Sequence, residues 1–171
     1  MFYSKFKAHI EALLFANGNP ISARKIAQII EVPSEHVELL IGQLILEMAN
    51  DIRGLTIVKV AAGYQLCTKP ELSIVIKKLV QVQDFKLSSA AMETLSIVAF
   101  KQPITKQEIE NIRGVKVDKV LTKLLERQMI KEIGRKEAIG RPILYGTTDE
   151  FLKSFGLNRL QDLPSLTELL S

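Results

Sequence analysis

The 171-residue chain has a single cysteine, Cys67, which excludes a framework of intrachain disulfides. Such scarcity is typical of proteins from reducing compartments. Long apolar runs are also missing. The N-terminal stretch MFYSKFKAHIEALLFANG is unbroken only from Ala12 to Ala16, and no run approaches the roughly 20 residues that cross a bilayer. We therefore expect a cytosolic protein without a secretory signal or a membrane segment.

Residues suited to catalysis are few. The two histidines, His9 and His36, lie on separate expected helices with no cysteine or second histidine at ligand spacing, which argues against a zinc site. The loop at residues 134–141, GRKEAIGR, lacks the pattern G-x-x-x-x-G-K followed by Ser or Thr that cradles phosphates. Cys67 lies in an expected strand and is interpreted as a small packed side chain. We expect no catalytic residue, no metal, no cofactor and no enzymatic activity.

Neither sign of charge is in large excess, since 23 basic and 19 acidic residues give a net charge of +4. The excess is localised. Residues 113–141 contain 9 basic and 4 acidic side chains, whereas residues 1–83 contain 9 and 7. Any strong electrostatic contact is therefore expected in the second half of the chain.

The chain contains an internal repeat at a constant offset of 83 residues. The stretch NPISARKIAQIIEVP, from Asn19, corresponds to QPITKQEIENIRGVK, from Gln102. A repeat of this length in 171 residues favours two small domains of about 80 residues each. We predict domains at residues 1–82 and 83–156, joined by the short linker QVQDFKL and followed by a leucine-rich tail at residues 157–171.

Periodicity and turn signals predict the same order of elements in both copies. In the first copy we expect an opening helix that ends at Gly18, a helix 23–30 capped by Ser22, a helix 34–50 capped by Ser34, strands 54–60 and 63–68, and a closing helix 70–80. In the second we expect helices 90–100, capped by Ser88 or Ser89, 106–112, capped by Thr105, and 116–128, then strands 129–133 and 143–147 and a helix 149–155.

Three helices followed by a hairpin are the order of a winged helix, a variant of the helix-turn-helix motif. The expected fold class is therefore mainly α with small β-hairpin wings (α+β), arranged as two tandem winged-helix domains.

The expected helix 34–50 is poorly suited to reading DNA, because it has three glutamates and neither lysine nor arginine. Leu39 and Leu46 are predicted on its outer side, with Gly42 between them, where a neighbouring backbone could approach closely. Two interpretations stay open. These residues form a homodimer interface, or the hairpin or closing helix of the same domain covers them.

The corresponding helix of the second copy, residues 116–128, is basic on its outer side. Lys116, Lys119, Lys123 and Arg127 fall within a sector of about 80°, and the following loop adds Arg135, Lys136 and Arg141. This pattern fits a partner contact or weak, non-specific binding of duplex DNA. The alternative is a solvated charged face, partly paired with Asp118 and Glu126.

The tail repeats leucine at every third position from Leu157 to Leu169, with Pro164 interrupting any continuous helix. So much leucine is costly to leave in water. We expect Leu160, Leu163 and Leu166 to dock either on the chain's own second domain or on a partner.

Five blocks of the sequence resemble one family. They are IEALLFANGNPIS, GYQLCTKPEL, LSSAAMETLSIVAFKQPITKQEIENIRGV, GRPILYGTTDEFLKSFGL and LNRLQDLPSL. Their order and spacing run over nearly the whole chain and are similar to those of the segregation and condensation protein B (ScpB) family.

The resemblance implies a non-enzymatic adaptor built from two winged-helix domains. In that family the N-terminal domains pair into a homodimer, and the C-terminal domains grip the kleisin ScpA, which bridges the ATPase heads of SMC. The implied role is regulation of the SMC complex in chromosome condensation and segregation during cell division, in the cytoplasm and associated with the nucleoid. The rival interpretation is a DNA-binding regulator that uses the basic second domain.

Overall fold

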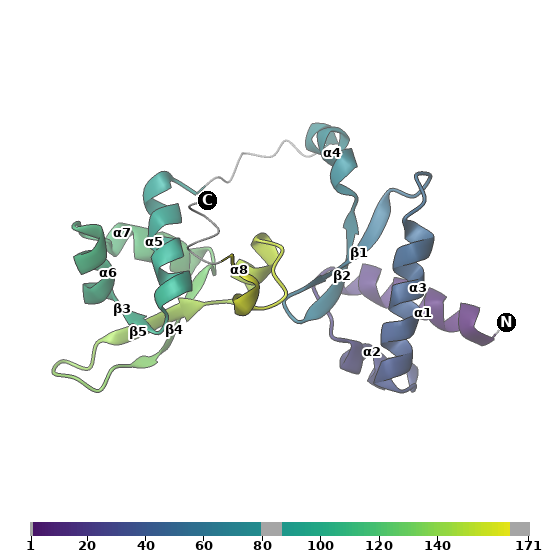
Figure 1. Ribbon diagram of the computed structural model, residues 1–171, viewed down its shortest axis with the longest axis horizontal. Coiled ribbons are helices and arrows are strands. Elements are labelled where there is room, and N and C mark those ends of the chain that lie inside the picture. The colour runs from purple at the N-terminus through teal and green to yellow at the C-terminus, as the bar shows by residue number, and fades with distance from the viewer. Residues whose placement is uncertain (1, 80–86, 165–171) are drawn as a thin grey trace. The chain divides into compact units, whose positions relative to one another are not determined.

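The computed structural model describes residues 2–79 and 87–164 (Figure 1). The chain divides into two compact units, one of residues 1–83 with 157–171 and one of residues 84–156. Each unit combines helices with a small antiparallel sheet, which confirms the predicted α+β winged-helix class.

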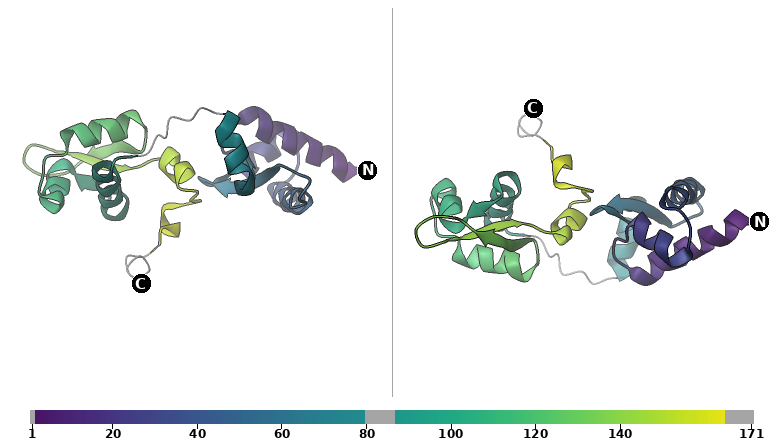
Figure 2. Two further views of the ribbon diagram at one scale, coloured as in Figure 1. Left: turned by 90° about the horizontal axis from the view of Figure 1, so that it is seen from above. Right: turned by 90° about the horizontal axis from the view of Figure 1, so that it is seen from below.

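In the first unit, the β1–β2 hairpin lies beside the helices α1–α3 (Figures 1 and 2). Its elements are α1 (Phe2–Asn17), α2 (Ala23–Ile30), α3 (Ser34–Met48), β1 (Leu55–Val60), β2 (Gly63–Thr68), the 3-10 turn η1 (Pro70–Leu72) and α4 (Ser73–Leu79). The core comes from α1, α2, α3 and β1, with Ile10, Ile26, Leu40 and Ile41 among its fully buried side chains.

The ends of these helices follow the sequence signals with one exception. Gly18 adopts a positive φ of 64° after α1, and the Ser22 hydroxyl accepts a hydrogen bond from the Lys25 amide at 3.2 Å. The expected cap at Ser34 is wrong. The residue before the helix is Pro33, no side chain caps this end, and Ser34 is already helical. Pro33, with φ of −59° and ψ of 145°, lies outside the helix and provides the break before it.

The repeated stretch joins the wing as well as capping a helix. Ile21 pairs with Tyr64 in the first unit through two backbone hydrogen bonds, of 3.0 and 2.9 Å. In the second unit, β3 (Ile104–Thr105) pairs with β5 (Ile143–Thr147). Sequence reasoning missed both pairings, the isolated bridge at Ile21 and the two-residue strand β3, because one or two residues are too short to show a strand period.

The hairpin turn of the first unit holds two alanines in the left-handed region, with φ of 48° at Ala61 and 56° at Ala62. Their amides donate to the carbonyl oxygens of Leu157 and Asn158, at 2.9 and 3.0 Å. The start of the tail, expected on the second domain or on a partner, therefore contacts the hairpin of the first unit. A second short 3-10 turn, η2 (Leu160–Asp162), follows.

The second unit is a three-stranded winged helix whose sheet has the order β3-β5-β4. Its other elements are α5 (Ser89–Lys101), α6 (Lys106–Arg113), α7 (Asp118–Glu126), β4 (Ile130–Arg135), β5 (Ile143–Thr147) and α8 (Asp149–Ser154). A bulge between Glu132 and Gly134 interrupts the pairing of β4 with β5. In Figure 1 the β4–β5 hairpin extends past the helices of its unit.

Ser88, rather than Ser89, caps α5, and Thr105 caps α6 as predicted. The helix predicted at residues 116–128 is shorter in the structure, where it covers Asp118–Glu126. The Val117 amide, just before it, donates to the Glu110 carboxylate at 3.2 Å.

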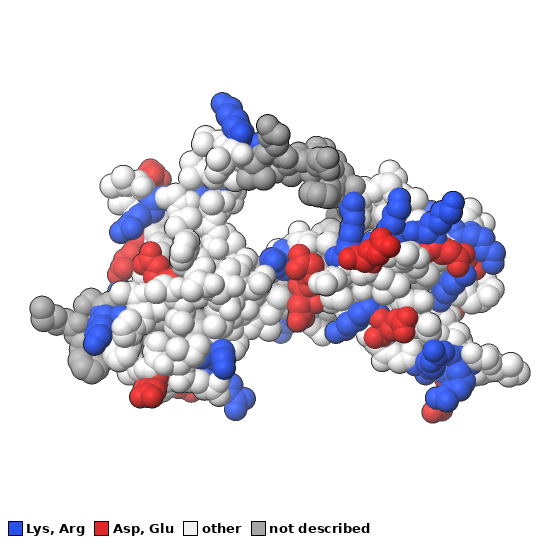
Figure 3. All heavy atoms as spheres, turned by 180° about the vertical axis from the view of Figure 1, so that it is seen from behind, with Lys and Arg blue, Asp and Glu red and all other residues white. Residues whose placement is uncertain are grey.

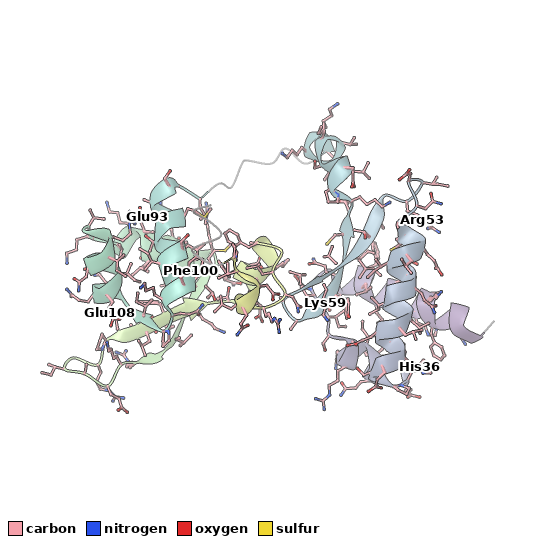
Figure 4. All side chains as sticks on the ribbon, viewed as in Figure 1. His36, Arg53, Lys59, Glu93, Phe100 and Glu108 are labelled. Atoms are coloured by element: carbon pink, nitrogen blue, oxygen red, sulfur yellow. The ribbon has the colours of Figure 1, made fainter. Side chains whose placement is uncertain are left out.

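A polar contact fixes α6 against α5. The Arg113 guanidinium donates to the Ala90 carbonyl at 3.0 Å and to the Thr94 hydroxyl at 2.5 Å, and it pairs with Glu93 at 3.0 Å. Thr94 is fully buried, so this bond lies inside the unit. Glu93 and Phe100 are labelled along α5 in Figure 4.

In the described ranges, no helix is both long enough and apolar enough to cross a bilayer.

Candidate protein-interaction surfaces

The outer side of α3 exposes apolar side chains. Leu39 is 54% exposed and Leu46 is 75% exposed, and nothing lies within 4 Å of the point where a Cβ of Gly42 would sit. The hairpin and α4 therefore do not cover these three residues, which we call the α3 seam. Exposed leucines on one helix face mark a surface that a second molecule can bury.

The charges around the α3 seam do not suit a phosphate backbone. Glu35 and Glu38 are exposed, and Glu47 pairs with Lys7 of α1 at 2.6 Å. α3 itself contains no lysine or arginine. The position that reads bases in a DNA-binding winged helix is thus apolar and acidic in the first unit.

A second apolar surface of the first unit was not anticipated from the sequence. No residue of α4, within the described span 73–79, is buried, and Ile74, Val75 and Leu79 are all strongly exposed. Ile52, in the loop after α3, lines the same hollow as Leu72 next to this helix. The signal was available, because SIVIKKL has too many apolar residues for a single inward stripe.

Only part of the predicted basic face lies on a helix. Since α7 covers Asp118–Glu126, Lys116 precedes it and Arg127 caps its end, so the predicted four-residue helical sector is wrong. Lys119 and Lys123 remain, one turn apart and exposed, and in the part of the chain described neither forms an ion pair. Figure 3 shows blue side chains over the second unit, at the right of that view, with red ones between them.

The α6–α7 junction is closer to the solvated, paired surface of the alternative interpretation. Lys116 pairs with Glu110 at 3.2 Å, and Lys106 forms a short ion pair with Asp118. The hydrogen bond from Lys106 lowers the pKa of Asp118 and the same bond raises the pKa of Lys106. Charges at this junction are thus largely neutralised locally.

Lys136 joins the wing to the start of α6. Its ammonium lies 2.6 Å from a Glu108 carboxylate oxygen, while the other carboxylate oxygen accepts from the Thr105 amide and hydroxyl, both at 2.8 Å. This completes a capping box with Thr105. The Lys136 bond, and then the two Thr105 bonds, lower the pKa of Glu108 to about 2. Glu108 lies at the sheet end of α6 in Figure 4.

Glu108 gives a pH-dependent stability. Its folded pKa of about 2 lies below the ordinary value of 4.5, so its stabilising contribution is complete above pH 4.5 and is lost as pH falls towards 2. We expect Glu108→Gln to lower the free energy of unfolding by about 1 kcal/mol at pH 7, because the carboxylate is 39% exposed and solvent screens the pair. Urea titrations should show this difference shrinking between pH 4.5 and 2. The exposed Glu126→Gln serves as the control, and an unchanged difference at pH 2 would contradict the assignment.

The wing tip of the second unit is ordered by its own backbone. The Lys136 amide donates to the Pro142 carbonyl and the Arg141 amide to the Ala138 carbonyl, both at 2.9 Å, and an Arg135 guanidinium nitrogen donates to the Arg141 carbonyl at 3.1 Å. The three predicted cations of this loop, Arg135, Lys136 and Arg141, are therefore exposed on an ordered hairpin. Lys136 is paired, and the two arginines lie where the loop joins the strands.

The remaining predicted residues have mixed outcomes. Leu160 and Leu163 are half-buried, and Leu166 lies outside the described residues. Cys67 is half-buried in β2, in line with a packed side chain. Among the residues that the structure describes, no three His, Cys, Asp or Glu side chains gather as metal ligands would.

The fold and these surfaces define a tandem winged-helix protein whose first unit presents apolar side chains where a DNA reader presents cations. A sequence model of the family described as segregation and condensation complex subunit ScpB matches residues 8–166. The chain therefore belongs to the ScpB family. The family's description is that of a complex subunit rather than an enzyme.

Individual relatives agree. Segregation and condensation protein B of Symbiobacterium thermophilum is 49% identical over 164 residues, covering 96% of this chain and 75% of the relative. That of Brevibacillus brevis is 51% identical over 166 residues, covering 96% and 86%. A solved dimer of an ScpB N-terminal domain complexed with ScpA peptide is 33% identical, covers 47% of this chain and all of that one, and has a TM-score of 0.46.

Proposed function

We propose that this chain is a non-enzymatic adaptor that forms a homodimer through its first unit, binds the kleisin ScpA, and through ScpA joins and regulates the SMC complex in chromosome condensation and segregation. It would act in the cytoplasm, at the nucleoid. Membership of the ScpB family supports the complex, and the ScpA peptide named with a relative's N-terminal domain supports the partner.

The observation that best supports a homodimer is the solvent exposure of the α3 seam. In a two-fold interface the same patch of each protomer meets its copy, so Leu39 and Leu46 would each be buried twice. Gly42 between them has no side chain and leaves room for the partner's backbone. The exposed apolar residues of α4 offer a second candidate surface on the same unit.

Besides the N-terminal domain, which is the part complexed with an ScpA peptide in the solved relative, the second unit offers a stripe along α5 for a further ScpA contact. Met92 and Phe100 are both exposed, at 40% and 37%, and Ser96 lies between them at i+4. Residues at this spacing share one helix face. An apolar stripe on a helix that Arg113 fixes to its neighbour is a rigid docking surface for an apolar segment of ScpA.

Co-purification tests this assignment. Tagged ScpA from the same bacterium should retain the wild-type chain, and Met92→Glu with Phe100→Glu should reduce the retained chain at least tenfold, because two charges would be buried in an apolar contact. Lys119→Gln with Lys123→Gln is the control and should leave retention unchanged. If the Met92/Phe100 variant folds and still binds fully, the ScpA contact does not use this stripe.

A further inference from the structure

The second unit presents cations on the helix where the first unit presents glutamates and apolar side chains. From the geometry of α7 and its wing, we infer that the second unit makes weak, sequence-tolerant contact with the phosphate backbone of duplex DNA, in addition to any binding of ScpA.

The cations occupy the two positions that a winged helix presents to a duplex. Lys119 and Lys123 lie one turn apart on the exposed side of α7, about 6 Å along its axis, and form no ion pair in the described structure. α7 follows α6 as the second helix of the helix-turn-helix, which is the element that enters the major groove. An α-helix, about 10–12 Å in diameter with its side chains, fits a major groove about 12 Å wide.

The wing supplies the second contact. Arg135 and Arg141 are exposed where the loop joins the two strands. The hydrogen bond from the Arg135 guanidinium to the Arg141 carbonyl holds them together. The backbone bonds across residues 136–142 fix the tip, so little conformational entropy is lost on contact.

Two observations limit the strength of this contact. Lys106, Lys116 and Lys136 are already paired with Asp118, Glu110 and Glu108, and the acidic Glu126, Glu132 and Glu137 are exposed near the free cations. About four cations remain available for phosphate contacts, so we expect micromolar affinity at low salt. The logarithm of the binding constant should fall with the logarithm of the salt concentration with a slope of about −3 to −4. Exposed base-reading side chains are scarce on α7, whose remaining outer residues are acidic or Thr122, so sequence preference should be small.

The first unit is the internal comparison. Its corresponding helix, α3, carries glutamates and the apolar seam, and its hairpin turn is the uncharged pair Ala61 and Ala62, whose amides are bonded to Leu157 and Asn158. One chain therefore contains the same fold twice, once with exposed cations on the second helix of the helix-turn-helix and in the hairpin loop, and once without them.

The experiment is fluorescence anisotropy of a labelled 24-base-pair random duplex with the whole chain, in 50 to 200 mM salt. The variant Lys119→Gln, Lys123→Gln and Arg135→Gln should weaken binding at least tenfold and flatten the salt slope towards −1, since each lost phosphate contact removes about one unit. The control Arg24→Gln, Lys25→Gln and Lys59→Gln changes the net charge equally but in the first unit, and should stay within twofold of wild type.

The other outcomes are equally decisive. The inference would be overturned if no binding were detectable at 50 mM salt. It would also be overturned if both triple variants lost equal affinity, because binding would then depend on net charge and not on the cations of α7 and the wing. Duplex RNA should bind several-fold more weakly, because its deep and narrow major groove does not admit a helix, and equal affinity would rule out docking through α7. Circular dichroism of both variants verifies folding, and ScpA co-purification of the first triple variant should persist.

Discussion

The chain carrying Leu39→Glu together with Leu46→Glu will sediment as a folded monomer at concentrations where the wild type is a dimer. Both leucines are exposed in the single chain, so their replacement removes no core contact. In a two-fold interface the pair of changes alters four buried leucines and places four carboxylates in an apolar contact. The free energy of dimer formation therefore becomes less favourable by about 4 kcal/mol or more, which raises the dissociation constant of the dimer about 1,000-fold.

Two controls locate the interface. Phe15→Glu changes an equally exposed apolar residue of α1 and should leave the dimer intact. Ile74→Glu with Val75→Glu tests α4. If this α4 variant is monomeric while the Leu39/Leu46 variant stays dimeric, the α3 seam is not the interface and the apolar surface of α4 takes its place.

Gly63→Ala will destabilise the first unit by about 2 to 3 kcal/mol, the upper range for overpacking. A Cβ at residue 63 would lie 3.0 Å from the backbone nitrogen and carbonyl carbon of Ile21. Backbone atoms cannot rotate away as a side chain can, so the Ile21 backbone must shift by a few tenths of an ångström, which strains its two hydrogen bonds with Tyr64. The melting temperature of the unit should fall by about 10 °C or more.

The matched control is Gly42→Ala, since no atom lies within 4 Å of its added methyl and alanine is favoured inside a helix by about 1 kcal/mol. Both changes are best measured by thermal unfolding in the monomeric Leu39→Glu, Leu46→Glu background, where dimer formation adds nothing to stability. Equal melting temperatures for the two glycine variants would contradict the close approach of Ile21 and residue 63.

Local signals in the sequence were sufficient for most of the fold. Ser22 and Thr105 cap helices because a hydroxyl reaches the amide three residues on, which needs no tertiary contact. The hairpins were likewise predictable, because alternation and the turn before Gly63 lie within a few residues. The 83-residue repeat then indicated that one fold occurs twice.

Long-range contacts explain the errors. The pairing of Ile21 with Tyr64 joins residues 43 positions apart and has no period of its own. The bond from the Val117 amide to Glu110 delays the start of α7, and with it removes Lys116 from the predicted basic helical face. The ion pair of Lys136 with Glu108 depends on how the wing meets α6, which a sequence pattern does not record.

Surfaces were the least predictable part. The positions of Leu39 and Leu46 on α3 follow from helical geometry, but that geometry does not say whether α4 covers them, and in the structure both are exposed. The exposed face of α4 was missed for the same reason, because an apolar pattern indicates burial without saying against what. The two copies thus share caps and cores, and differ in the residues that they present to partners.

The most direct test of this account is sedimentation velocity of the whole wild-type chain, alone and mixed with purified ScpA of the same bacterium. We expect a dimer when the chain is alone at micromolar concentration, and a faster boundary containing both proteins after mixing. A chain that stays monomeric and sediments independently of ScpA would contradict the claim that these winged helices serve to bind protein.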